Sequence, residues 1–93
     1  MREIDERLPG ADLIREGLRD LERGVESVPA LLVLVGAPRL RRLGLNVPDT
    51  DYFPEDRLYE QLAAVHGDGA HSQYNALIRR LVSFERAAEC GSR

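Results

Sequence analysis

Residues 27–44 read Ser-Val-Pro-Ala-Leu-Leu-Val-Leu-Val-Gly-Ala-Pro-Arg-Leu-Arg-Arg-Leu-Gly, and they include the most apolar run of the chain, Ala30–Val35. Ser27 is a residue type that caps helix N-termini. Pro29 suits the first turn of a helix, because the N–H that proline lacks has no intrahelical partner there. These two residues predict that a helix begins at about residue 28.

The same run is also compatible with a buried strand, because Val33 and Val35 are β-branched. No second strand-like run is present to pair with it, so we favour the helix. Pro38 disfavours helical geometry at the residue before it. We therefore expect a break at Gly36–Pro38, followed by a short helix, Arg39–Leu43, that ends at Gly44.

Apolar residues at three- and four-residue intervals predict three further helices, at about residues 11–25, 54–66 and 71–89. The side chains expected on their buried faces are Leu13, Ile14, Leu18, Leu21, Val25, Leu58, Leu62, Val65, Tyr74, Leu77, Ile78, Leu81, Phe84 and Ala88. Ser72 is the expected cap of the last helix. With residues 28–43 counted as one broken helix, the sequence predicts a compact all-α domain of about four helices.

Three residues on these apolar faces need a specific reason to be there. Gly17 and Gly24 lie on the inner side of the first helix, where an interior glycine costs about 1 kcal/mol relative to alanine. We expect another backbone to pack closely against them. Glu85 lies between apolar positions of the last helix, and a buried carboxylate needs a partner. We expect a salt bridge or hydrogen bond from an arginine within residues 39–42.

The domain organisation follows from the length of 93 residues, which supports a single small core. Residues 10–93 form the expected domain, and residues 1–9 a flexible N-terminal arm that becomes ordered only where Ile4 and Leu8 find a surface. A core this small is often completed by a homodimer. The single cysteine, Cys90, favours a reducing compartment. No leader and no apolar run of membrane-spanning length is evident, so we expect a cytoplasmic protein without membrane association.

The charge pattern singles out one cationic cluster, formed by Arg39, Arg41 and Arg42 in a stretch without acids. Arg79 and Arg80 extend it if the last helix packs beside it. Three explanations stay open: pairing with acids of this chain, docking of an acidic protein partner, and binding of phosphate or nucleic acid. The break between two short helices outlines a helix-turn-helix, but the second helix is too short to read a major groove, and the pI near 5.3 disfavours DNA.

A catalytic or metal-binding constellation is not evident in the sequence. His66, Asp68 and His71 are close together but match no ligand spacing. Cys90 has no neighbouring base that would activate it. We therefore expect no enzyme activity, metal or cofactor. The favoured function is a small protein-interaction module, such as an adaptor, an accessory subunit or an antitoxin-like regulator. It would bind an acidic partner surface through the five arginines; the alternative is a nucleic-acid-associated protein.

Overall fold

The computed structural model describes residues 4–91, and within this range it contains helices and turns but no strand. The elements are α1 (Ala11–Glu22), α2 (Val28–Val35), α3 (Ala37–Arg42), α4 (Pro54–His66), the 3-10 turn η1 (Gly67–Gly69) and α5 (Ala70–Gly91). The all-α prediction is confirmed, with the expected broken helix present as the consecutive helices α2 and α3.

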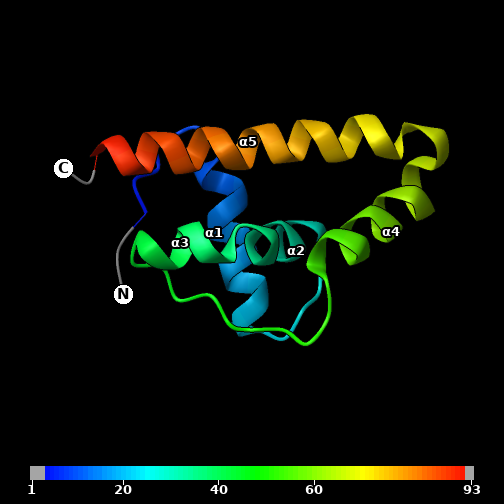
Figure 1. Ribbon diagram of the computed structural model, residues 1–93, viewed down its shortest axis with the longest axis horizontal. Helices are drawn as coiled ribbons and strands as arrows, with labels where there is room; N and C mark the ends of the chain where they lie inside the picture. The colour runs from blue at the N-terminus through cyan, green and yellow to red at the C-terminus, as the bar shows by residue number, and fades with distance from the viewer. Residues whose placement is uncertain (1–3, 92–93) are drawn as a thin grey trace.

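Helix α5 organises the arrangement of the others (Figure 1). Its 22 residues extend for about 33 Å at 1.5 Å per residue, and the longest extent of the molecule is 40 Å. Helices α2 and α3 follow one another along α5, and α1 crosses them. Helix α4 slopes away and joins the start of α5 through η1, whereas Ile4, the first described residue, lies near the other end of α5.

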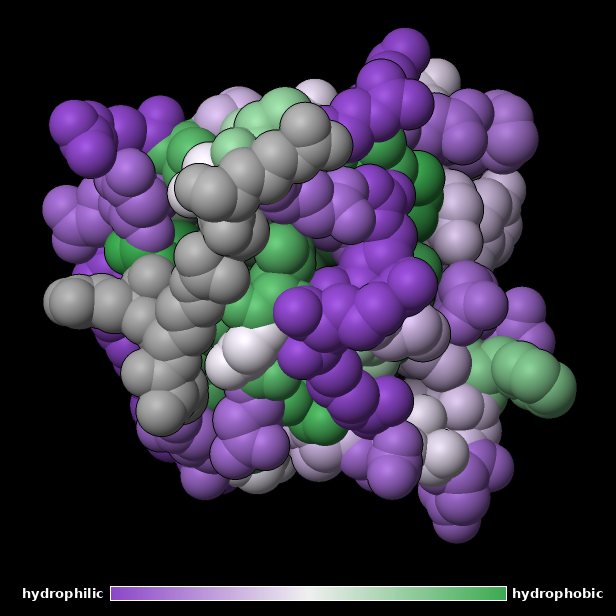
Figure 2. Space-filling model, turned by 60° about the vertical axis from the view of Figure 1, so that its left-hand side comes forward, coloured by the Kyte–Doolittle hydropathy of each residue, from purple (hydrophilic) through white to green (hydrophobic). Residues whose placement is uncertain are grey.

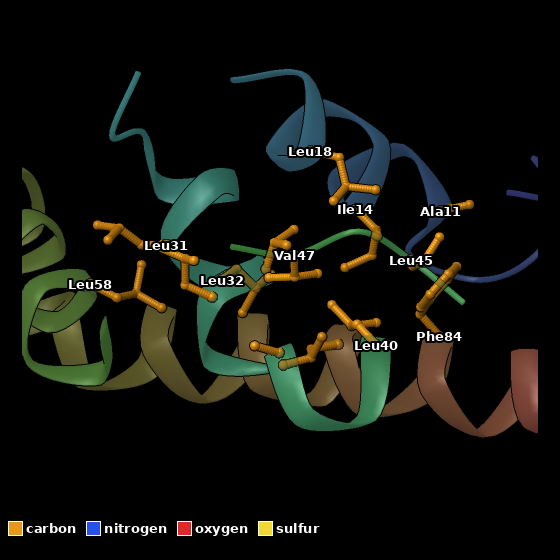
Figure 3. Packing of buried hydrophobic residues seen from close by; sticks show 14 of the residues in the cluster. Ala11, Ile14, Leu18, Leu31, Leu32, Leu40, Leu45, Val47, Leu58 and Phe84 are labelled. Carbon is orange, nitrogen blue, oxygen red and sulfur yellow. The ribbon is translucent and has the colours of Figure 1, made fainter. Parts of the chain in front are cut away.

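The centre of the core is α2, as the apolar run predicts. Ala30, Leu31, Leu32 and Val33 have no exposed surface. Figure 3 shows Leu31 facing Leu58 of α4, while side chains of α1 approach from another side. A helix that is apolar all round has to be covered on every side, and α1, α4 and α5 provide that cover.

The contact between α1 and α2 depends on Gly17, as predicted. A Cβ atom at this position would lie 2.3 Å from the carbonyl oxygen of Pro29 and 2.5 Å from Cγ2 of Val33. Only glycine allows the two helices to approach so closely. The same prediction was wrong for Gly24, which lies in open space beyond the end of α1 with φ of +71°.

The start of α2 also agrees with its prediction, because the Ser27 hydroxyl accepts a hydrogen bond from the Ala30 N–H at 3.2 Å. The same hydroxyl donates to Asp20 Oδ2 at 2.6 Å and so ties the cap to α1. The predicted break is narrower than expected. Only Gly36 separates α2 from α3, and Pro38 lies in the first turn of α3, where a proline is tolerated.

Other predicted boundaries need correction. Helix α1 ends at Glu22 rather than near residue 25, because the left-handed Gly24 terminates it, and Val25 is 42% exposed. Helix α5 begins at Ala70, so Ser72 lies inside the helix rather than at its cap. Helix α4 has its predicted bounds, but Val65 is 79% exposed, because it lies near the end of α4 that slopes away from the body.

Candidate functional site

The buried carboxylate of Glu85 has the partner that the sequence predicts. Glu85 is 3% exposed, and its Oε1 lies 3.3 Å from Nη1 of Arg39. The other terminal nitrogen of Arg39 donates to Glu89, one turn further along α5. The planar guanidinium can serve both carboxylates at once. Arg39 therefore joins α3 to the C-terminal half of α5.

The two carboxylates respond oppositely to this environment. Burial raises the pKa of Glu85 above its usual value, and the nearby charge of Glu89 adds to this effect, although Arg39 and Arg42 oppose it. The hydrogen bond from Arg39 lowers the pKa of Glu89. At Glu85 the loss of solvation outweighs the ion pair, because the carboxylate is almost fully enclosed.

The remaining arginines of α3 point in other directions. Arg41 donates from Nε to the Val47 carbonyl at 2.9 Å and from Nη2 to the Pro48 carbonyl at 3.0 Å. Its Nη2 also lies 2.8 Å from Oδ1 of Asp49. Arg41 therefore fastens the loop after α3. Arg42 is exposed, with a long contact of 3.4 Å to the Pro38 carbonyl.

The two predicted arginines of α5 do not join this group. Arg80 reaches α1, where its Nη2 lies 3.2 Å from Oδ1 of Asp12. Arg79 is exposed on the side of α5 that faces away from its buried stripe. Of the five predicted residues, Arg39, Arg41 and Arg80 thus bind other segments of this chain. Arg42 reaches the Pro38 carbonyl of its own helix, and both Arg42 and Arg79 are exposed.

An apolar groove lies at the end of the molecule where Ile4 and Gly91 come together. We call it the terminal groove, and it has a volume of about 240 Å³. Its lining residues are Ile4, Asp5, Leu8, Leu43, Leu45, Phe84, Ala88 and Gly91. Figure 2 brings this end forward and shows hydrophobic surface lying between hydrophilic side chains. The lining residues Leu43, Leu45 and Phe84 are themselves buried, so the groove is a hollow beside the core rather than an exposed apolar face.

Residues 4–8, which we call the N-terminal segment, form one wall of the terminal groove. Ile4 and Leu8 are half-buried and pack against the core. The segment predicted as an arm thus reaches an apolar surface with these two side chains; its residues 1–3 lie outside the described part of the chain. Glu6 forms an ion pair with Arg15 of α1, and Arg7 pairs with Asp5 inside the segment.

The residues considered for metal or acid–base chemistry lie on the surface. His66 and His71 are exposed, and Nε2 of His71 contacts the amide nitrogen of Asn75 at 3.2 Å. Across residues 4–91, no group of three or more His, Cys, Asp or Glu side chains is arranged to hold a metal ion. Cys90 is exposed and not in a disulfide. Within the same residues, every helix is too short or too polar to cross a bilayer.

Comparison with known proteins provides no assignment. No protein-family model matches the chain, and neither the curated proteins nor the solved structures searched gave a match.

The sequence did not reveal the terminal groove, although part of its signal was present. Leu43 and Leu45 flank Gly44, whose φ of +94° turns the chain so that both side chains are buried. Leu43 and Leu45 form one apolar pair in a short irregular segment, and Ile4 and Leu8 form another. Helical periodicity does not assign such pairs to a buried face. Only the tertiary arrangement brings these pairs to the same end of α5.

Proposed function

We propose that this protein is a small interaction module that docks a protein partner in the terminal groove. The observation that carries the proposal is an apolar hollow at one end of the molecule, lined in part by the core residues Leu43, Leu45 and Phe84. Its volume of about 240 Å³ is smaller than most small-molecule sites, which measure about 300–1,000 Å³. A hollow of this size suits one or two apolar side chains anchored from a partner segment.

Among the described residues that line the groove, the one that carries a charge, Asp5, pairs with Arg7, and two further arginines near the groove favour an acidic partner. Arg42 directly precedes the groove residue Leu43 and is exposed. The side chain of Arg15 is 42% exposed, and its ion-pair partner, Glu6, directly follows the lining residue Asp5 in the sequence. A partner that places a carboxylate beside its apolar anchors would meet these guanidinium groups, and complementary charge favours both encounter and register. Adaptors, accessory subunits and antitoxin-like regulators are the classes of protein that this proposal covers. If the protein is a homodimer, the partner in the same proposal is a second copy of the chain.

The test is affinity capture with the tagged wild-type protein and matched variants. Ala88→Arg fills the groove, whereas Gly91→Glu puts a negative charge at its edge, where an added side chain meets nothing within 4 Å. Ala64→Arg, on the exposed surface of α4, is the control. We expect one stoichiometric partner that Ala64→Arg retains and that both groove variants lose, with all three variants folded by circular dichroism.

Capture that is equal for all variants would contradict a docking role for the groove. Capture of nucleic acid instead, with an affinity that falls steeply as salt increases, would replace the proposal with the nucleic-acid alternative.

A further inference from the structure

The N-terminal segment occupies the edge of the terminal groove with two apolar side chains. Ile4 and Leu8 are four residues apart, and both pack against the core at the edge of the groove. Between them, Glu6 reaches Arg15 of α1. Two apolar anchors with an intervening carboxylate are the features that we expect of the partner, so the chain carries such a sequence itself.

Apart from the packing of Ile4 and Leu8 against the core, the described polar contacts of this segment are few and exposed. Two of its hydrogen bonds are local, from the Leu8 N–H to the Asp5 carbonyl at 3.1 Å and from the Ala11 N–H to the Leu8 carbonyl at 3.2 Å. The Arg7–Asp5 pair also lies within the segment. The ion pair between Glu6 and Arg15 does reach a helix, but their side chains are 72% and 42% exposed, and such pairs contribute little.

The segment joins the body at a point where it can detach without unfolding α1. Gly10 precedes α1 with φ of +76°, a conformation that glycine adopts readily. A Cβ atom at Gly10 would lie 2.9 Å from the Arg80 carbonyl oxygen, so the start of α1 is pressed against α5. Pro9 and Gly10 therefore separate a firmly packed helix from a peripheral segment.

We propose that the N-terminal segment is an intramolecular competitor for the partner site. The partner inserts two apolar side chains four residues apart, with an acidic residue between them that takes over Arg15, and in doing so it displaces Ile4 and Leu8. This inference rests on the proposed function, since it concerns occupancy of the same groove. A tethered competitor lowers the apparent affinity for a partner by the fraction of molecules in which it occupies the site.

The experiment uses a synthetic peptide with the sequence of residues 1–10, MREIDERLPG, as the probe. Its binding is measured by NMR titration against the wild-type protein and against Ile4→Ser/Leu8→Ser, which weakens the segment's own anchors. We expect the double variant to bind the peptide at least five-fold more tightly. Glu6→Gln, which removes only the tether to Arg15, should shift the affinity in the same direction by a smaller factor.

Matched controls identify the site of binding. Ala88→Arg, added to the double variant, should abolish peptide binding. A peptide with arginine in place of Asp5 and Glu6 should bind more weakly than the native sequence. Val65→Ser, an exposed substitution on α4, should leave the wild-type affinity unchanged. Circular dichroism at the titration temperature establishes that each variant is folded.

Equal affinity of the peptide for wild type, the double variant and Glu6→Gln would overturn the competition, as would the absence of binding to all three. This result is separate from a failure of the proposed function. If captured partner is lost in Ala88→Arg while the peptide shows no preference, the groove docks a partner but the N-terminal segment does not compete for it. If Ala88→Arg captures as much partner as wild type, the proposed function itself fails.

Discussion

The two halves of α5 carry the same kind of apolar stripe but meet very different surroundings. In the C-terminal half, Leu81 packs against Gly36 between α2 and α3, Glu85 pairs with Arg39 of α3, and Phe84 lines the terminal groove. In the N-terminal half, Tyr74 meets Tyr59 of α4 with ring centroids 5.8 Å apart. Helix α4, η1 and this half of α5 form a hairpin, which we call the projecting hairpin, that extends away from the rest of the molecule (Figure 1). Side chains of one periodic stripe thus lie in the dense interior, in the lining of the terminal groove and in the projecting hairpin. Periodicity alone does not distinguish these surroundings.

The largest expected difference between the halves concerns buried volume. Phe84→Ala removes a side chain that is 2% exposed and should lower the free energy of unfolding by about 3–5 kcal/mol. Leu77→Ala, at a half-buried site, should lower it by about 1–2 kcal/mol, because less apolar surface is lost. Urea denaturation measures both. Equal losses would show that the projecting half is as densely packed as the other.

The next effect concerns the close approach of Gly36 to α5. A Cβ atom there would lie 2.8 Å from Cδ1 of Leu81 and 3.1 Å from Oε2 of Glu85. Gly36→Ala should therefore cost about 1–3 kcal/mol through overpacking. Gly69→Ala, beside the other end of α5, meets nothing closer than 3.7 Å. It should be neutral or stabilise by up to about 1 kcal/mol. Thermal and urea unfolding of the pair test this contrast, and equal destabilisation would contradict it.

A pH series compares two carboxylates of α5, Glu85 and Glu89, whose pKa values are shifted in opposite directions. Because burial raises the pKa of Glu85 in the folded state, the folded protein binds that proton more readily than the unfolded chain. The contribution of Glu85 to stability is therefore greatest below its unfolded pKa, and it declines as pH rises through the folded pKa. Glu89 has a lowered pKa, so its contribution is present above its unfolded pKa and is lost as pH falls through the folded pKa.

The measurement is urea denaturation of wild type, Glu85→Gln and Glu89→Gln between about pH 3 and pH 8. As pH falls from neutral, the stability of wild type relative to Glu85→Gln should increase. At the acidic end, the stability of wild type relative to Glu89→Gln should decrease. Parallel curves for the three proteins would contradict the opposite shifts of the two carboxylates.

The smallest effect is expected on the projecting hairpin. Val65→Ala should change the free energy of unfolding by no more than about 0.5 kcal/mol, because the side chain is 79% exposed. Leu62, on the same helix and 4% exposed, provides the contrast, and Leu62→Ala should cost at least about 2 kcal/mol. A large loss from Val65→Ala would mean that this surface is covered in solution, for example by a second copy of the chain.

The sequence was sufficient wherever a local rule and tertiary packing agree. Ser27 and Pro29 marked the start of α2, and the position of Glu85 in an apolar stripe required the arginine that Arg39 supplies. It was insufficient where the outcome depends on how far neighbouring elements extend. Val65 has the periodicity of a buried residue but lies where α4 slopes away from the body, and Gly24 has the spacing of a packing glycine but ends a helix.

The candidate site shows the same limit. The arginines of α3 were found as a cluster in sequence, but helical geometry directs Arg39 to α5 and Arg41 to the loop that follows α3. The terminal groove depends on three segments that are distant in sequence: the N-terminal segment, the turn after α3 and the end of α5. No local pattern places them together.

The central claim is that the terminal groove, rather than the projecting hairpin, receives the partner. Hydrogen exchange measured by mass spectrometry, on the protein alone and with its captured partner, tests this claim most directly. We predict slower exchange in residues 43–47 and 84–91 on binding, faster exchange in the displaced residues 4–8, and no change in residues 59–74. Protection confined to residues 59–74, with the groove unchanged, would contradict the claim.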